Sequence, residues 1–372
     1  MNVEIRAASS PGEVRVALLR DGKLAEYALW RPGAPDGVGD VHRGRVLRHM
    51  PAMAGAFVAL VEAEGFLPDS EGGKGLTEGT LLPVRITRAA QGGKGPRLSA
   101  RIPGRDPGVA TGDGVALLSR GPNAIARFAD QHRDAPILVD DLALLAELRP
   151  HYGARVDRTI EVFDESLLTA IDALAEPHLT LPSGARLSIY PTPALTAIDV
   201  DAGAALAAGG RRAERHAAVN QAVIPAVADQ IRLRNLSGAI VIDLAGLPIR
   251  RRVALGPDIE TALAADSLRP RFLGFSALGL AEVLRPRVHP PLHELLAGPH
   301  AAGLAALRAV AAESAAQPSL RIELRAAPPV VMALQKDEAA LAALARQTGR
   351  VLSLIADPAM RPDEWRMEAR DE

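Results

Sequence analysis

The distribution of apolar and polar residues predicts an α/β chain organised around residues 181–247. Two apolar, strand-like runs lie there, LSIYPTPALTAIDVD and SGAIVIDLAGL. Between them, residues 211–234 repeat apolar positions at helical spacing. Strand, helical crossover and strand is the pattern of a parallel pair, which brings both strand ends to the same edge of a sheet.

The strand ends in this unit carry aspartates. Asp199 and Asp201 end the first run, and Asp243 lies in the second. Because side chains alternate along a strand, Asp201 is expected on the same side as Asp199. Carboxylate oxygens are the ligands that Mg²⁺ prefers, so the pattern predicts a magnesium site at this edge.

The segments on either side of this unit differ in the spacing of their apolar residues. Residues 1–30 alternate like a hairpin with Asp21-Gly22 at its turn, and residues 39–101 contain five short runs with Gly-rich turns, typical of a small barrel. Residues 102–133 are Gly- and Pro-rich and are interpreted as a connector. Residues 134–180 predict strand, helix, strand and helix, added to the N-terminal hairpin with the barrel inserted between. Residues 303–372 predict a small unit of alternating helices and strands.

The barrel segment carries a candidate site for single-stranded nucleic acid. Phe57 and Phe66 lie nine residues apart, and Lys94 lies in the loop QGGKGPR. Bases stack on aromatic rings while cations meet phosphates. The alternative is that both phenylalanines belong to the core of the barrel.

Two further clusters are open to more than one interpretation. Arg250, Arg251 and Arg252 follow the second aspartate strand, as a phosphate-binding rim or as a solvated strand end. The histidines of HPPLHELLAGPH, at 289, 293 and 300, could ligate a metal or belong to a linker, and the linker is the favoured interpretation.

The charge, the absence of cysteine and the lack of long apolar runs exclude several classes of protein. The 372 residues have a formal net charge of −1, although residues 39–101 hold nine Lys and Arg against six Asp and Glu. The absence of cysteine excludes disulfides, thiolate zinc sites and cysteine nucleophiles and fits a reducing cytoplasm. Without a signal-peptide pattern or an apolar run of about 18 residues, the expectation is a soluble cytoplasmic protein with no membrane span.

The order of motifs resembles the catalytic region of the ribonuclease E/G family of bacterial endoribonucleases. The motifs are GDVHRGRVLR, AFVALVEAEGFLP, KGPRLSARI, LPSGARLSIYPTPALTAIDVD, IRLRNLSGAIVID and LRPRV. The pair LTAIDVD and GAIVID is the most specific of them.

The resemblance implies an α/β multidomain fold in which an RNase H-like subdomain is interrupted by an OB-type RNA-binding barrel. A DNase I-like catalytic subdomain, a linker and a small C-terminal α/β domain follow. The expected boundaries are 1–38 and 134–180 for the RNase H-like parts, 39–101 for the barrel, 102–133 for a shortened connector, 181–288 for the catalytic subdomain, 289–302 for the linker and 303–372 for the C-terminal domain.

The resemblance also assigns roles to residues. Asp199 and Asp243 match the two aspartates that hold the catalytic Mg²⁺, with Asp201 as a third catalytic candidate. Phe57, Phe66 and Lys94 match substrate-contacting positions of the barrel, and Arg43 joins them as an RNA-binding candidate. The implied reaction is hydrolysis of single-stranded RNA to a 5′-phosphate and a 3′-hydroxyl, with the ion orienting water and neutralising charge at phosphorus.

Four departures from the family pattern qualify this picture. Asp201 stands where the family usually has Asn, and Gly246 stands where it often has another Asp. The zinc-linking Cys-Pro-x-Cys motif is absent, so no structural zinc and no zinc-joined tetramer are expected, although a homodimer through the C-terminal region remains an expectation. The connector lacks the Arg-Thr pair of the family's pocket for a 5′-monophosphate, so no 5′-end sensing is expected.

Three interpretations of the function follow from the sequence. The first is a Mg²⁺-dependent endoribonuclease, and the second is a relative that binds RNA but has lost efficient cleavage. A bland interpretation, in which the aspartates cap strands and bind nothing, is the third.

Overall fold

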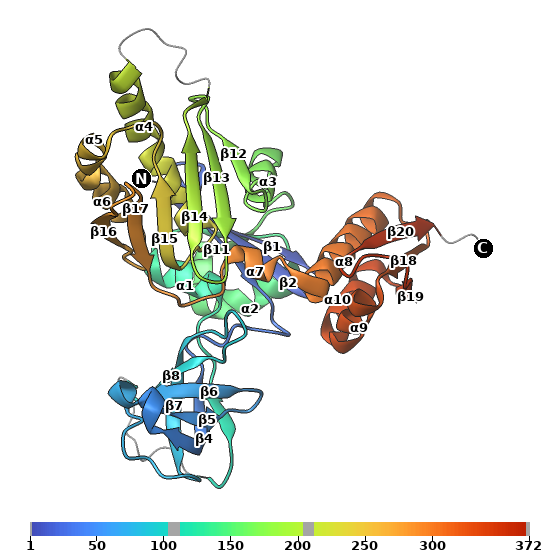
Figure 1. Ribbon diagram of the computed structural model, residues 1–372. Coiled ribbons are helices and arrows are strands. Elements are labelled where there is room, and N and C mark those ends of the chain that lie inside the picture. Colours follow the sequence, from blue (N-terminus) through green and yellow to red (C-terminus); the bar gives the residue numbers. More distant parts are fainter. Residues whose placement is uncertain (1, 103–111, 204–211, 370–372) are drawn as a thin grey trace. The chain divides into compact units, whose positions relative to one another are not determined.

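The computed structural model describes residues 2–102, 112–203 and 212–369, and side chains from residue 216 onward in the last segment. These residues form two compact units. The first comprises Met1–Pro35, Ala124–Leu284 and Pro291–Glu372, and the second comprises Asp36–Asn123 and Arg285–Pro290. Residues 103–111 of the predicted connector and residue 211 of the predicted helix lie outside the described residues. Figure 1 draws both units and labels helices and strands where there is room.

The N-terminal sheet of the first unit joins two distant segments. Its order is β11-β10-β1-β2-β3, with β10 parallel to both β1 and β11. The strands are β1 (Val3–Ser10), β2 (Glu13–Arg20), β3 (Lys23–Trp30), β10 (Ile137–Val139) and β11 (Val156–Arg158). The predicted hairpin is confirmed, since Asp21 (φ 49°) and Gly22 (φ 76°) turn β2 into β3 with the two positive φ angles of a tight hairpin turn.

The helices of this segment include the two predicted for residues 134–180, in the predicted order. They are α1 (Ala124–Gln131), α2 (Leu142–Tyr152), the short 3-10 helix η4 (Gly153–Arg155) and α3 (Glu165–Asp172). Asp141 and Asp164 cap α2 and α3 by accepting from the N–H groups of Leu144 and Leu167. The interpretation of residues 102–133 as a bare connector is wrong for its second half, where β9 (Ala116–Ser119) and α1 form. The amphipathic spacing of Ile125, Phe128 and Ala129, which α1 buries, is the reason for the helix.

The second unit is a closed, OB-like barrel of five strands. β4 pairs with both β5 and β7, which closes the circle through β6 and β8, and β9 adds to β4. The strands are β4 (Val41–Met50), β5 (Gly55–Ala59), β6 (Glu64–Pro68), β7 (Leu81–Arg88) and β8 (Arg97–Ser99), with short 3-10 helices η1 (Pro51–Met53) and η2 (Asp69–Glu71). The five predicted strands are therefore confirmed. The barrel encloses a core of Val46, Ala56, Val58, Leu60, Leu67, Val84, Ile86 and Leu98.

A six-stranded sheet, of order β12-β13-β14-β15-β17-β16, carries the three aspartates. Its elements are β12 (His178–Thr180), β13 (Arg186–Pro191), β14 (Thr196–Asp201), α4 (Arg212–Leu233), β15 (Gly238–Asp243), α5 (Ile249–Val253), α6 (Gly256–Leu263), β16 (Arg271–Phe275) and β17 (Ala281–Arg285). The predicted crossover is confirmed, because β14 and β15 are parallel and α4 connects them. The first apolar run is two antiparallel strands rather than one, because Pro191 precedes, and Pro193 lies within, a turn in which Thr192 bonds to Leu195.

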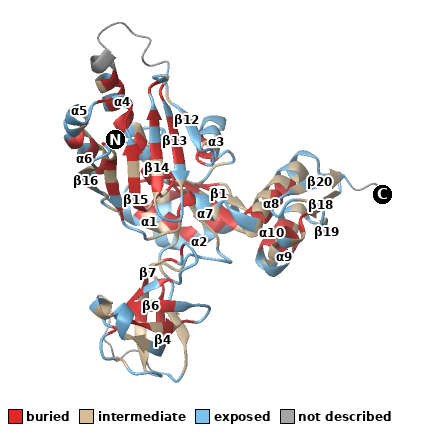
Figure 2. Cartoon of the chain, in the orientation of Figure 1, coloured by how far each residue is buried: buried red, intermediate tan, exposed pale blue. Residues whose placement is uncertain are grey.

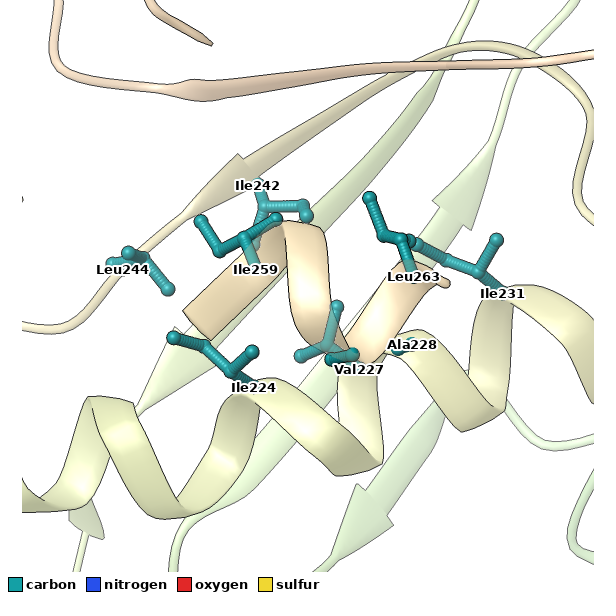
Figure 3. Close-up of a pocket in the computed structure, with 9 residues that line it drawn as sticks. Ile224, Val227, Ala228, Ile231, Ile242, Leu244, Ile259 and Leu263 are labelled. Atoms are coloured by element: carbon teal, nitrogen blue, oxygen red, sulfur yellow. The ribbon is translucent and has the colours of Figure 1, made fainter. Parts of the chain in front are cut away.

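One face of this sheet packs on α4 and α6. Burial alternates along β14, where Ile198 and Val200 are buried and Asp199 and Asp201 are exposed. Figure 2 colours the strands of this sheet by burial. Figure 3 shows the apolar contact of α4 with α6 and β15, which leaves a cavity of only about 10 Å³. A wholly apolar lining of this size holds core packing and no ligand. The sheet therefore has a core face and, opposite it, a face that carries the aspartates.

The C-terminal segment has its own core and three-stranded sheet, of order β19-β18-β20. Its elements are α7 (Leu292–Leu295), α8 (Gly298–Ala316), β18 (Ile322–Ala326), α9 (Pro328–Lys336), α10 (Glu338–Thr348), β19 (Ser353–Ala356) and β20 (Trp365–Ala369). The single helix expected after β18 is two helices, because Asp337 leaves helical conformation and caps α10 through the Ala340 N–H. Among the described helices, none combines the length and apolarity that crossing a membrane would need.

Candidate functional site

The two aspartates of the predicted metal site are register partners. In the parallel ladder of β14 and β15, the Cα of Asp199 lies opposite the Cα of Asp243. Neighbouring strands are about 4.8 Å apart, and partners in register point to the same face. Both residues are exposed, on the face opposite α4. The geometry therefore brings two carboxylates together at one strand end.

The neighbouring strand β13 extends this polar face. Ser188 is the antiparallel partner of Asp199, and its hydroxyl lies 3.1 Å from Nδ1 of His178 on β12. The His178 ring in turn contacts Tyr190 edge-on, with ring centroids 5.9 Å apart. The Ser188 hydroxyl thus lies on the strand next to Asp199, and the His178 imidazole follows on the next strand.

Arg252 places a positively charged guanidinium next to Asp243. Its Nη1 donates to Asp243 Oδ1 at 2.8 Å, and two backbone carbonyls, of Leu247 and Gly279, hold the same guanidinium. Arg250 and Arg251 are exposed on α5 and have no such tie. Of the predicted arginine cluster, one member reaches the aspartates, and it lies on a helix rather than at a strand end.

Asp201 has a different environment from the pair. Its Oδ1 accepts from the N–H of Gly203 at 3.0 Å, and its strand partner is Arg186. Across the described residues, no three His, Asp or Glu side chains gather closely enough to form a metal cluster. The oxygen donors that the structure assembles are therefore a pair, which suffices for Mg²⁺ because this ion keeps most of its waters.

A buried clamp positions the end of β15. Asn220, on α4 and fully buried, donates to the carbonyl of Ala245 and accepts from its N–H, at 2.8 and 2.9 Å. The next residue, Gly246, has φ 53°, and a Cβ there would lie 2.4 Å from the His216 ring. His216 is 5% exposed, and neither ring nitrogen has a hydrogen-bond partner among the described residues. The position where the family often has an acid is therefore covered by an imidazole.

The barrel places its two phenylalanines outside the core. Phe57 on β5 and Phe66 on β6 are cross-strand partners, half-buried, with ring centroids 5.5 Å apart in an edge-to-face arrangement. The Arg48 guanidinium lies 4.4 Å from the Phe57 ring centroid and pairs with Glu64 at 2.9 Å. The alternative that these rings form the barrel core is wrong, because the inward positions are Ala56, Val58 and Leu67.

The two other barrel candidates differ in accessibility. Lys94 is exposed in a tight turn whose ends, Gln91 and Lys94, bond to each other. Arg43 is half-buried on β4, and its Nε donates to the carbonyl of Gly114. Lys94 thus presents its cation to solvent, whereas Arg43 holds the segment before β9.

The linker histidines do not converge. His289 bonds to Asp36 in the barrel unit, whereas His300 bonds to Asp337 in the first unit. His293 is exposed.

Some residues of the site were not predicted from the sequence. Asn220 had a detectable signal, because it is a lone polar residue inside the apolar stripe of a predicted helix. Ser188, His178 and the individual role of Arg252 had none, since each depends on strand or loop pairings that spacing does not define.

Comparisons with known proteins agree with this arrangement of parts. The Ribonuclease E/G family model matches residues 139–288. Ribonuclease G of Escherichia coli K12 is 27% identical over 80% of this chain and 82% of its own length. Ribonuclease E of the same strain is 26% identical over 77% of this chain, which spans only 37% of that protein.

One relative has a higher sequence identity over a shorter stretch of the chain. Ribonuclease E of Nostoc sp. PCC 7120 is 36% identical over 34% of this chain, and 18% of its own length is covered. The matched residues include both aspartate strands, Asn220 and Ala245. By this match and these relatives, the chain is similar to the ribonuclease E/G family.

Proposed function

We propose that this protein is a Mg²⁺-dependent endoribonuclease that hydrolyses single-stranded RNA in the bacterial cytoplasm and leaves a 5′-phosphate and a 3′-hydroxyl. The observation that carries the proposal is the register of Asp199 with Asp243, in a chain similar to an endoribonuclease family. The barrel, with its outward phenylalanines and Lys94, supports a single-stranded substrate.

The carboxylate pair fits a hard divalent cation. Both side chains offer oxygen donors on one face. Among the described residues, the Asp199 carboxylate has no hydrogen bond or ion pair. Bound Mg²⁺ would polarise the scissile phosphate and lower the cost of charge at phosphorus. Asp199 and Asp243 are the residues that would hold it.

The protein's own groups have distinct parts in this proposal. Arg252 fixes one oxygen of Asp243 and leaves the other for a cation. The guanidinium also adds positive charge beside the place where negative charge develops on the phosphate. Asn220 holds the strand end so that the carboxylate spacing persists without reorganisation.

The finer domain assignment is part of the proposal. The sheet of β1–β3, β10 and β11 would be the RNase H-like subdomain, and residues 181–288 the DNase I-like catalytic subdomain. The C-terminal segment would support a homodimer, which light scattering of the purified chain tests directly.

A second function is favoured by specific observations. The ion pair of Arg252 with Asp243 and the glycine at position 246 both weaken a site for a cation. These features would suit a protein that binds RNA and cleaves it slowly or not at all.

One assay separates the two functions. A labelled A/U-rich oligonucleotide is incubated with the full chain in Mg²⁺ or in EDTA, and the product ends are identified. Cleavage to 5′-phosphate products in Mg²⁺ alone supports the nuclease, with equal rates for 5′-hydroxyl and 5′-monophosphate substrates because no 5′-end pocket is expected. Binding without cleavage in Mg²⁺ would contradict the nuclease and leave the binding protein.

A further inference from the structure

A continuous row of cross-strand partners crosses the surface of the barrel. The pairs are Arg48 with Phe57, Phe57 with Phe66, Phe66 with Arg97, and Arg97 with Arg88. The row therefore runs over β4, β5, β6, β8 and β7. We call these five residues the ladder. Four steps of ~4.8 Å make it about 19 Å long.

Two bulges bring the outer arginines onto this row. The register of β4 shifts between Val46 and Arg48, and that of β7 shifts between Ile86 and Arg88. In each strand the extra residue lets a buried aliphatic side chain be followed, two positions later, by an arginine that faces outward. Without the bulges, strict alternation would put these arginines on the core side.

The cationic end of the ladder gains a third arginine from the segment Arg285–Pro290, which belongs to the same unit as the barrel. Arg287 adjoins Val288, whose carbonyl accepts from the N–H of Ala89, next to Arg88. Burial, together with the charges of Arg97 and Arg287, lowers the pKa of Arg88. None of these three arginines makes an ion pair within the described residues, whereas Arg48, at the other end, pairs with Glu64. Three adjacent like charges without a counterion are unfavourable alone, and an anion would offset their repulsion.

We propose that Arg97, Arg88 and Arg287 form a phosphate subsite that continues the base-stacking face of Phe57 and Phe66, so that the ladder with Arg287 is a track for single-stranded RNA and the three arginines bind consecutive phosphates. The inference rests on the proposed RNA-binding function and extends it to a phosphate subsite that includes Arg287. Guanidinium groups suit phosphate because they offer paired donors. Lys94, three residues before Arg97, lies in the turn that leads to β8 and flanks the track.

The test is oligonucleotide binding in EDTA, which separates binding from cleavage. Fluorescence anisotropy of a labelled single-stranded RNA gives the affinity of the full chain at several salt concentrations. Each of Arg88→Gln, Arg97→Gln and Arg287→Gln should lower the slope of log affinity against log salt by about 0.7, the value for one phosphate contact on a single strand. Arg97→Lys should keep the slope, because it keeps the charge.

Matched variants distinguish the track from general positive charge. Arg45→Gln removes an exposed arginine of the same barrel outside the ladder and should leave the slope unchanged. Phe57→Ala with Phe66→Ala should lower affinity about five- to 150-fold per stacked base while keeping the slope. Thermal melting of every variant shows whether the barrel is folded.

Three results would overturn the proposal: an equal loss of slope in Arg45→Gln, unchanged slopes in all three track variants, or no binding of single-stranded RNA by the wild-type chain. A chain that binds as expected but does not cleave would contradict the nuclease function and leave the track intact.

Discussion

Asp199 and Asp243 lie opposite each other, yet their surroundings differ. Asp243 is tied to a guanidinium, whereas Asp199 lies between Ser188 and Asp243 with no ion pair among the described residues. The uneven pairing means that a cation approaching the pair meets one open carboxylate and one that is partly neutralised. Asp199 therefore carries the larger share of the attraction.

Asp201 is the residue whose exchange tests the departure from the family pattern. Its carboxylate accepts from the Gly203 N–H, which an Asn side chain can also do. Asp201→Asn should keep the free energy of unfolding within about 0.5 kcal/mol, as for most surface substitutions, and should keep or raise the cleavage rate. Urea denaturation and single-turnover cleavage measure both. A tenfold loss of rate in Asp201→Asn would mean that its charge is needed.

Gly246 and His216 form a pair that can be exchanged together. Asp tolerates the positive φ of Gly246, but its Cβ would overlap the buried imidazole. Gly246→Asp should therefore destabilise the protein by about 1–3 kcal/mol, the usual cost of overpacking. Adding His216→Ala should recover part of that loss, because the ring no longer fills the space.

A double-mutant cycle of urea unfolding measures this coupling. Strictly additive losses in Gly246→Asp, His216→Ala and the double variant would contradict the packing argument.

Glu26 gives a pH-dependent prediction. Burial on β3 raises the pKa of Glu26, and Arg20 opposes the shift only in part. The protonated form is favoured in the folded state, so this contribution to stability is present below the unfolded pKa of ~4.3 and is lost as pH rises through the folded value. The free energy of unfolding of Glu26→Gln, relative to wild type, should therefore increase from pH 4.5 to pH 7. A relative decrease over that range would show that the Arg20 ion pair dominates.

At the scale of elements, α4 both packs the sheet and positions its edge. Its apolar stripe covers β14 and β15, while Asn220 satisfies both backbone groups of Ala245 in the interior. Asn220→Ala leaves a buried donor and a buried acceptor unpaired, which should cost about 1–3 kcal/mol for each group.

The same substitution should raise the Mg²⁺ concentration for half-maximal cleavage, because the end of β15 is no longer held. Gln221→Ala is the matched control, since Gln221 is its exposed neighbour and its side chain bonds to Asp258. Equal effects of the two variants on the Mg²⁺ dependence would exclude the clamp.

For the barrel, the sequence predicted the strands but not which residues pair across them. Five strands were predicted because their apolar runs and Gly turns are local signals. The outward positions of Phe57 and Phe66 and the alignment of Arg97 with Arg88 depend on pairing partners and on bulges. Bulges have no period in the sequence, so the ladder was not predictable from spacing.

At the scale of the whole molecule, the order of parts was predictable and their pairings were only partly so. The parallel β14–β15 pair and the addition of β10 and β11 to the N-terminal hairpin follow from crossover rules. The His178–Ser188 contact and the Arg252 tie to Gly279 join loops and edge strands, where local composition carries no partner information. The resemblance to a family supplied the reaction, which no pattern of residues alone defined.

The proposed division of labour gives each unit a separate readout. The barrel unit would bind RNA through the ladder, and the carboxylate pair in the first unit would cleave it. Loss of a carboxylate should therefore stop cleavage without weakening binding.

The most direct measurement is single-turnover cleavage of a single-stranded RNA across a Mg²⁺ titration, for wild type, Asp199→Asn and Asp243→Asn. Wild type should cleave only with Mg²⁺, and each Asn variant should lose at least about 100-fold in rate, as expected when ~3 kcal/mol of transition-state stabilisation is removed. Their RNA affinity in EDTA should match that of wild type. Undiminished cleavage by either variant, or no cleavage by wild type at any Mg²⁺ concentration, would contradict the nuclease account.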